Sequence, residues 1–372
     1  MKVLLTCELF PPDFAGGGEY IVLEIARGLI NRGINVQVVT TGDPRITEFE
    51  GIPTTRLPVS RYRFNLQFRT IAEIARDVDL IQTSFYHACL PSLTAARRLR
   101  KPVVGLVLGL FQDAWYEMKP VPFGGVWSLC ERFLLTRDYT RLVFLSEFSK
   151  SLGVRLGFPE DRAAVICPGI DLGCYQAASR KEDVVFFTGK LDARKGVYDL
   201  LEVARALPDV TFRVMGWGPQ EAKIRGLAPR NIEFRHFERG KPGRELRKAF
   251  ADARIFFFPS KSETFGLAIL EAMASGCAVI SSVPLSFEGI KIDAGDRAAM
   301  IAAISKLWKN RDLTWQMGRR NMELAQLFTW ERYITELLGV YQSIMPGFTI
   351  PERIAFEERS IHKWGQPQPH DP

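Results

Sequence analysis

Two glutamates in the second half of the chain are the residues whose type and spacing point most directly to chemistry. Glu263 and Glu271 bracket the tripeptide Phe265-Gly266-Leu267, which predicts the start of a helix. Free backbone amides at such a start can bind an anion or a sugar hydroxyl. Glu271 would lie inside the helix among apolar neighbours, where the two hydroxyls of a ribose could satisfy its carboxylate. The alternative is a helix cap followed by a satisfied structural glutamate.

Two lysines lie in a loop earlier in the same half. Lys190 and Lys195 follow the apolar run 183–188, which predicts a strand, and Gly196 precedes a helical pattern. Two ammonium groups at the carboxyl end of a strand can hold a diphosphate and stabilise the charge that it gains on leaving. A solvated basic loop is the alternative interpretation.

A glycine-rich turn near the N-terminus is a third candidate site. The segment 10–12 (Phe-Pro-Pro) ends a strand-like run, and three glycines, beginning with Gly16 and Gly17, open a helical pattern. Glycine lets the backbone approach a phosphate closely, and a helix start offers free N–H groups. The segment is neither a Walker loop nor a Gly-x-Gly-x-x-Gly fingerprint, and a plain flexible turn is the alternative.

All these candidates lie where short apolar runs give way to helical patterns. In the first half the expected strands cover 2–7, 35–40, 80–84, 102–107, 141–145 and 163–166. In the second half they cover 183–188, 211–215, 232–235, 254–258 and 278–281, and the pattern is helical from 295 to 343. Apolar strands alternating with helices predict parallel sheets covered on both faces, with ligands at the carboxyl ends of the strands.

A break in this alternation predicts where one domain ends and the next begins. The stretch 167–182 contains proline, glycine and polar residues, which indicates a linker. The expected fold is therefore α/β, with two doubly wound, Rossmann-like domains that face a cleft. We place the domains at 1–168 and 169–329, followed by a helix at about 330–345 and an extended or disordered tail at 346–372.

Composition excludes several classes of protein. The 372 residues are 47% hydrophobic and 24% charged, which is typical of a folded chain with two domains and not of a disordered one. The sequence contains no apolar run as long as a membrane span and no signal-peptide pattern, so we expect a cytoplasmic protein. Six scattered cysteines argue against a disulfide framework or a zinc site. The net charge of +7 favours anionic partners but is too diffuse to indicate nucleic-acid binding.

The motifs, taken in order, resemble those of the retaining, GT-B-type glycosyltransferases of family 4, the glycosyl transferases group 1. They are Phe10-Pro11-Pro12, Gly16-Gly17-Gly18-Glu19, Ser146-Glu147-Phe148, Pro168-Gly169-Ile170-Asp171, Gly189-Lys190-Leu191 with Lys195-Gly196, Gly216-Trp217-Gly218-Pro219, the pair Glu263 and Glu271, and Phe328-Thr329-Trp330-Glu331. The resemblance covers roughly residues 1 to 345. The last motif is similar to the family's closing helix, which would join the helix at about 330–345 to the first domain.

The resemblance implies a role for each candidate residue. The second domain would bind a nucleoside-diphosphate sugar, and the first domain would hold the acceptor. Three residues would be catalytic: Glu263 by binding hydroxyls of the donor sugar, and Lys190 and Lys195 by holding the diphosphate. The donor would also be bound by Gly16, Gly17, Phe265, Gly266, Leu267 and Glu271, the last through its ribose. The family needs no bound metal or other cofactor.

The activity implied by this resemblance is transfer of a sugar to an acceptor hydroxyl with retention, in the assembly of a cell-surface glycan or glycolipid. The chain departs from the family pattern at two places. Leu108 stands where many members carry a histidine, and the stretch 282–296 is shorter than usual. A catalytically weak nucleotide-sugar-binding protein and a nucleotide-sugar epimerase on the same scaffold are the alternatives.

Basic side chains in the first half suggest one further partner. Arg61, Arg63 and Arg69 interleave with aromatic residues, and a second basic cluster lies at 97–101. Both clusters suit a lipid-linked acceptor or peripheral contact with an anionic membrane at the inner face of the cell. A solvated helix face is the alternative.

Overall fold

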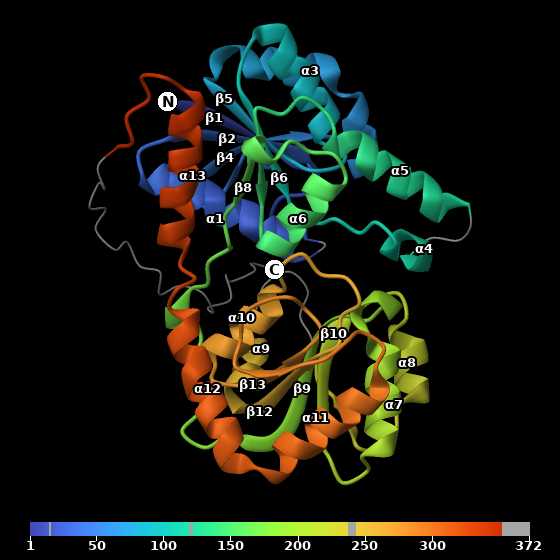
Figure 1. Cartoon of the computed structure of the whole chain (residues 1–372). Coiled ribbons are helices and arrows are strands. Elements are labelled where there is room, and N and C mark those ends of the chain that lie inside the picture. The colour runs from blue at the N-terminus through green and yellow to red at the C-terminus, as the bar shows by residue number, and fades with distance from the viewer. Residues whose placement is uncertain (15, 119–121, 237–242, 352–372) are drawn as a thin grey trace, which may run out of the picture.

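The computed structural model describes residues 1–14, 16–118, 122–236 and 243–351. The chain forms two α/β domains, each built on a mostly parallel sheet that helices cover (Figure 1). The expected fold class is therefore confirmed. Most of the tail expected at 346–372 lies outside the described residues. Within the described residues, no helix combines the length and the apolar character that a membrane span requires.

The first sheet has the strand order β3-β4-β2-β1-β5-β6-β7-β8. Its strands are β1 (Lys2–Thr6), β2 (Asn35–Thr41), β3 (Glu48–Phe49), β4 (Ile52–Leu57), β5 (Leu80–Ser84), β6 (Val103–Val107), β7 (Arg141–Phe144) and β8 (Ala163–Val165). The helices of this half are α1 (Gly17–Asn31), α2 (Phe68–Ile74), α3 (Cys89–Leu99), α4 (Ala114–Met118), α5 (Phe123–Leu135) and α6 (Glu147–Arg155). The winding reverses at β1, which pairs with both β2 and β5, so a crevice opens at the carboxyl ends of β1 and β5.

The second sheet has the strand order β11-β10-β9-β12-β13-β14. Its strands are β9 (Glu182–Lys190), β10 (Phe212–Trp217), β11 (Ile232–Phe234), β12 (Ala253–Phe258), β13 (Ala278–Ser281) and β14 (Gly289–Lys291). The helices are α7 (Val197–Ala206), α8 (Glu221–Leu227), α9 (Arg244–Asp252), α10 (Leu267–Ala274), α11 (Arg297–Lys309) and α12 (Arg311–Ala325). Here the winding reverses at β9, so the equivalent crevice lies at the carboxyl ends of β9 and β12.

The central strands explain why the sequence pattern was readable. Every residue of β12 is buried, and the rings of Phe186 in β9 and Phe256 in β12 pack 5.9 Å apart between their centroids. A strand covered on both faces carries an unbroken apolar run. The predictions of strands 80–84 and 278–281 are confirmed to the residue by β5 and β13, and the other expected strands are found with ends shifted by one or two residues.

Three strands were missed, and the stretch that we expected to be one helical region is interrupted. β4 was not predicted because Pro53 and three polar residues interrupt its apolar pattern, and β3 and β14 have only two and three residues. The expected continuous helical region 295–343 is divided into α11, α12 and α13 (Trp330–Ile344), with breaks at Asn310 and at 326–329.

The chain crosses between the two domains at two places that lie side by side. α13 leaves the second domain and packs against α1 of the first, where Tyr341 donates a hydrogen bond to Gln82 (Figure 1). The other crossing passes Gly169, where an added Cβ would lie 2.2 Å from the amide nitrogen of Trp330. The Ile170 amide also donates to the carbonyl of Phe328 at 3.0 Å, so the two crossings are bonded to each other.

Candidate functional site

The loops that follow β9 and β12 meet at the crevice of the second sheet. The Lys261 amide donates to the carbonyl oxygen of Arg194 at 2.8 Å, which ties one loop to the other. Gly196 ends the first loop with a φ of +70°, and a Cβ there would lie 2.1 Å from the carbonyl oxygen of Pro259. Only glycine fits both the backbone conformation and the close approach. The two loops therefore form one unit that presents their side chains together.

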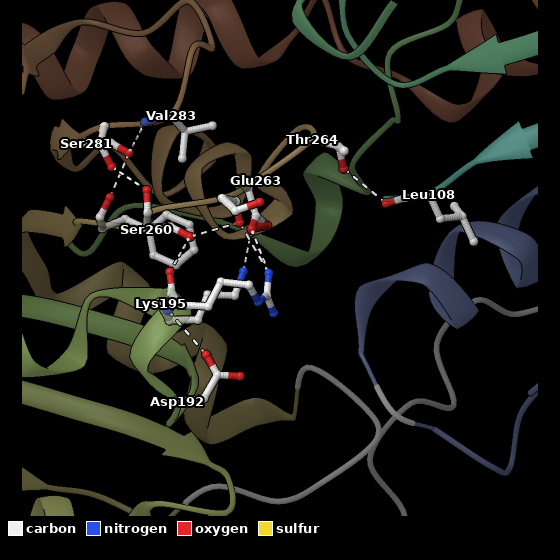
Figure 2. A network of polar contacts seen from close by, with 12 residues as sticks. Leu108, Asp192, Lys195, Ser260, Glu263, Thr264, Ser281 and Val283 are labelled. Carbon is white, nitrogen blue, oxygen red and sulfur yellow. Dashed lines mark hydrogen bonds and ion pairs between the residues drawn. The ribbon is translucent and has the colours of Figure 1, made fainter. Parts of the chain in front are cut away.

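An ion pair between Lys195 and Glu263 occupies the centre of this unit. The Lys195 ammonium contacts the Glu263 carboxylate directly, although the residues are 68 positions apart in the chain (Figure 2). Asp192 fixes the start of the loop by accepting the Lys195 amide at 3.2 Å. Burial lowers the pKa of Lys195, and the Glu263 carboxylate opposes that shift. The structure thus brings together two of the three residues that the sequence singled out as catalytic.

Arg194 is a member of this cluster that the sequence analysis missed. Its guanidinium nitrogen lies 3.8 Å from a carboxylate oxygen of Glu263 and donates to the Ser262 carbonyl at 3.2 Å. Its guanidinium carbon also lies 5.2 Å from the ring centroid of Phe111, a residue of the first domain. The signal available in the sequence was its place directly before Lys195, where it adds a second cation that could meet a phosphate.

Lys190 does not join the cluster. It ends β9 on the side that pairs with β10, opposite Trp217 in the parallel register, whereas Glu263 follows β12 on the other side of β9. Its ammonium nitrogen lies 5.7 Å from the centroid of the Trp217 ring. Its assignment to the diphosphate remains a prediction, which requires the side chain to reach across the end of β9.

The helix start expected at 265–267 is confirmed as the beginning of α10. Gly266 precedes the helix with a φ of +89°, a left-handed conformation that glycine adopts readily. The Phe265 side chain is buried and meets the ring of Phe328, so only its backbone can serve a ligand. The first turn of any α-helix leaves amides without intrahelical acceptors, and α10 directs this turn toward Gly17 of the first domain.

Glu271 lies on the second turn of α10 and is held by one side chain. The Tyr175 hydroxyl donates to its Oε1 at 2.6 Å. Burial raises the pKa of Glu271 to about 7, although the hydrogen bond from Tyr175 lowers it. Oε2 and the second lone pair of Oε1 can still accept hydrogen bonds, which fits the predicted contact with two ribose hydroxyls. Tyr175 comes from the linker, and no sequence pattern pointed to it.

The glycine turn of the first domain is braced from behind by a buried arginine. Arg56 donates to the carbonyl oxygen of Phe10 at 3.2 Å and to that of Pro11. Gly16 donates its amide to Glu19 Oε2 at 2.9 Å, which fixes the start of α1. A Cβ on Gly16 would meet nothing within 4 Å, so this part of the turn borders open space.

Three contacts join the first domain to the segment 264–267, which follows β12. A Cβ on Gly17 would lie 3.0 Å from Leu267 Cδ1, and the Thr264 hydroxyl donates to the carbonyl of Leu108 at 3.0 Å (Figure 2). Ser146, at the start of α6, donates its hydroxyl to the carbonyl of Thr264. The predicted donor residues of the two domains therefore face each other, with the Leu108 backbone at the contact.

An acid in the first domain, also missed from the sequence, organises the loop after β6. Glu131 of α5 is buried, and its carboxylate accepts hydrogen bonds from the amides of Phe111 at 2.9 Å and Gln112 at 2.8 Å. The Tyr86 hydroxyl, the Gln112 side chain and the Trp115 indole N–H, at 3.3 Å, donate to the same group. This network fixes the position of Phe111 against Arg194. The detectable signal was one glutamate within the otherwise apolar pattern of α5.

Comparison with known families covers both domains. Residues 15–173 match the family described as Glycosyltransferase Family 4, and residues 182–310 match the family described as Glycosyl transferases group 1. Together these matches include both sheet crevices and all the candidate donor-binding residues.

Several curated proteins are similar to this chain over most of their length. The O-antigen chain mannosyltransferase C of Escherichia coli is 25% identical, over 93% of this chain and 99% of that protein. The D-inositol 3-phosphate glycosyltransferase of Corynebacterium glutamicum is 24% identical, over 88% and 91%. The enzyme of the same name from Segniliparus rotundus is 31% identical over 216 residues, so this match spans about half of each chain.

Solved structures show the same fold. The structure of Anabaena HepE in complex with UDP and glucose superposes with a TM-score of 0.75 at 19% identity, over 92% of this chain and all of that one. Sucrose-phosphate synthase from Thermosynechococcus elongatus gives 0.76 at 18% identity, over 92% and 98%. Since the matched families run through both domains and the relatives align over nearly their whole length, the chain belongs to glycosyltransferase family 4 and has the GT-B fold.

Proposed function

We propose that the enzyme transfers a sugar with retention of anomeric configuration to a glycan or lipid-linked acceptor, in the assembly of a cell-surface glycan or glycolipid. The observation that carries this proposal is the Lys195–Glu263 pair at the crevice of the second sheet, opposite the glycine turn of the first. The cation that we propose for the leaving diphosphate and the acceptor that we propose for sugar hydroxyls are in direct contact. Donor binding would exchange this internal pair for contacts to the two parts of one ligand.

The residues around this pair divide the work of holding the donor. Lys195 and the first amides of α10 would stabilise the diphosphate as it departs, and Lys190 would join them by turning toward the crevice. Glu263 would accept sugar hydroxyls, and Glu271 the ribose hydroxyls. Gly16 and Gly17 would let the first domain approach the phosphates closely. In a retaining reaction of this class, the departing phosphate helps to deprotonate the acceptor on the same face of the sugar, so no separate base is required.

The relatives support the choice of donor and acceptor classes to be tested. HepE was solved with UDP and glucose, and the E. coli relative is named as an O-antigen chain mannosyltransferase. The actinobacterial relatives are named for D-inositol 3-phosphate. Uridine diphosphate sugars are therefore the first donors to try, followed by the diphosphate sugars of the other nucleosides, guanosine included. The first acceptors are short oligosaccharides, inositol phosphates and lipid-linked saccharides.

A donor panel with product analysis tests the proposal. We expect release of nucleoside diphosphate that depends on the acceptor, with the anomeric configuration of the donor kept in the product by NMR. An inverted product would contradict retention. Tight donor binding without turnover on any acceptor would instead support the binding-protein alternative, and a changed sugar without transfer would support the epimerase.

A further inference from the structure

Helix α5 of the first domain presents an apolar face to solvent. Phe123, Val126, Leu129 and Phe133 are 58%, 52%, 69% and 50% exposed. Their spacing of three to four residues places them on one side of the helix. Large apolar side chains gathered on one exposed helix face mark an interaction surface.

The opposite face of α5 is firmly attached to the domain. Gly124, Glu131 and Leu135 are buried, and Glu131 receives the hydrogen bonds that hold the loop after β6. Figure 1 shows α5 extending outward from the first domain together with α4. Because the inner face is fixed, the apolar outer face does not turn inward.

Two arginines lie beside this face. All residues of α5 are described, and its one exposed charged side chain is Arg132. Arg137 follows the helix and places its guanidinium carbon 4.0 Å from the centroid of the Phe133 ring. An apolar face bordered by arginines, whose stems can lie along apolar surface while their heads stay polar, suits the interface of an anionic bilayer.

A row of aromatic rings connects this surface to a basic segment. The His87 ring lies 6.0 Å from that of Trp127 in α5 and 5.2 Å from that of Tyr62, measured between centroids. Tyr62 is 53% exposed and belongs to the short 3₁₀ helix Arg61–Leu66, which carries part of the arginine cluster noted in the sequence. The apolar face and this cluster therefore belong to adjoining parts of one domain.

The same row leads in the other direction to the candidate donor site. Trp127 stacks on Trp115 at 5.2 Å between centroids, and Trp115 meets Phe111 at 5.2 Å. Phe111 in turn lies under the Arg194 guanidinium of the second domain. A continuous aromatic path thus joins α5 to the loop that carries Lys195.

We propose that the outer face of α5 docks on an anionic lipid bilayer and that the enzyme takes its acceptor from that surface. This inference rests on the proposed function, and it names the acceptor class as membrane-borne. Phe123, Val126, Leu129 and Phe133 enter the interfacial region, while Arg132 and Arg137 contact lipid phosphates. The aromatic path then lies between the lipid surface and the diphosphate site.

Vesicle sedimentation without nucleotide tests the docking apart from the chemistry. The full chain is mixed with vesicles of phosphatidylglycerol and phosphatidylcholine in equal parts. We expect it to sediment with them, and the double variant Leu129→Ser, Phe133→Ser to bind at least about tenfold more weakly. The matched control is Leu227→Ser with Leu327→Ser, which removes two exposed apolar side chains from the second domain and should bind like the wild type.

A second variant changes only charge. Arg132→Glu should weaken binding to the same vesicles about tenfold, whereas Lys306→Glu on α11 should not. Calorimetry with UDP and GDP shows whether each variant keeps its nucleotide site, so a failure to fold is separated from a failure to dock. If the wild type binds neither UDP nor GDP, the result counts against the proposed function and not against docking.

Two results would overturn the docking proposal. One is a wild type that stays in solution with anionic vesicles, or an α5 double variant that binds them as the wild type does. The other is self-association through this face. Ultracentrifugation would then show a wild-type oligomer that the double variant Leu129→Ser, Phe133→Ser converts to a monomer, and the wild type would not bind vesicles.

Discussion

The two sheet crevices share one architecture but hold their carboxylates in different ways. In the second domain, Glu263 is balanced by Lys195 and Arg194, whose long side chains can turn to a ligand. In the first domain, Glu131 is saturated by donors from the loop that it organises. A carboxylate whose partners can be exchanged is suited to binding a ligand. One that is satisfied by fixed internal donors is suited to holding a loop in place.

The largest expected effect concerns Lys195, an exchangeable partner of Glu263. Lys195→Ala should lower kcat by about 10³-fold, because a cation at the leaving diphosphate is lost, corresponding to about 4 kcal/mol at the transition state. Steady-state kinetics measures the loss, and circular dichroism checks that the fold persists. Lys306→Ala removes an exposed lysine from α11 and serves as the control. Near-normal turnover in Lys195→Ala would remove the phosphate role.

The next effect concerns Glu131, which holds the loop after β6 in place. Glu131→Gln should lower the free energy of unfolding by about 3 kcal/mol, because the amide group faces N–H donors that it cannot satisfy. Urea denaturation measures this loss, and UDP or GDP affinity should change far less than stability does. A variant as stable as the wild type with weakened nucleotide binding would show that Glu131 serves the ligand after all.

For Glu271 we expect an effect on nucleotide binding and an effect on stability, and both depend on pH. Glu271→Gln should weaken nucleotide binding about tenfold by calorimetry, because one acceptor for the ribose is lost, and Glu323→Gln on the surface of α12 is the control. Unchanged affinity would count against the ribose contact. In the wild type, the affinity should fall as the pH drops below about 7, where the carboxyl becomes protonated.

The stability of the same variant has a defined sign. The Glu271 carboxyl keeps its proton up to about pH 7 in the folded chain but loses it near 4.5 when unfolded. This group therefore reduces stability as the pH rises from 4.5 to 7. Glu271→Gln, which does not ionise, should match the wild type at low pH and exceed its free energy of unfolding by about 1–2 kcal/mol above pH 7. Thermal scans across this range give the comparison, and a difference independent of pH would refute it.

The smallest effect concerns the contact between the two crevices. Thr264→Val removes the hydroxyl that donates to the Leu108 carbonyl at 3.0 Å. We expect a loss of about 1 kcal/mol, seen as a several-fold rise in KM for the donor with little change in kcat. Thr335→Val on the exposed side of α13 is a control for the same chemical change. A kcat loss comparable to that of Lys195→Ala would mean that this bond takes part in the reaction step.

Much of the fold and part of the site could be read from the sequence. Short apolar runs such as 103–107 and 255–258 predicted the central strands, because strands buried on both faces need no polar alternation. β4 was not predicted because Arg56 and two threonines lie within it, and the guanidinium is satisfied by partners in the distant segment 10–13, the carbonyls of Phe10 and Pro11 and the carboxylate of Asp13. That pairing depends on tertiary structure, which a local pattern does not contain.

The same division applies to the candidate site. The helix start at Gly266 follows from local residue types and was predicted correctly. The contact of Lys195 with Glu263 and the hydrogen bond from Tyr175 to Glu271 join segments 68 and 96 positions apart, so spacing alone could not reveal them. Arg194 was overlooked because a third cation in a basic loop has no distinctive pattern.

The paired crossings at Gly169 and Trp330 have a consequence for how the enzyme admits its substrates. Because the two connections lie together and are bonded to each other, a swing of one domain relative to the other would pivot about this one place. Such a swing would separate Thr264 from Leu108 and Arg194 from Phe111. It would leave Lys195 and Glu263 together, since both belong to the second domain. The contacts between the two domains can therefore change without breaking the Lys195–Glu263 pair.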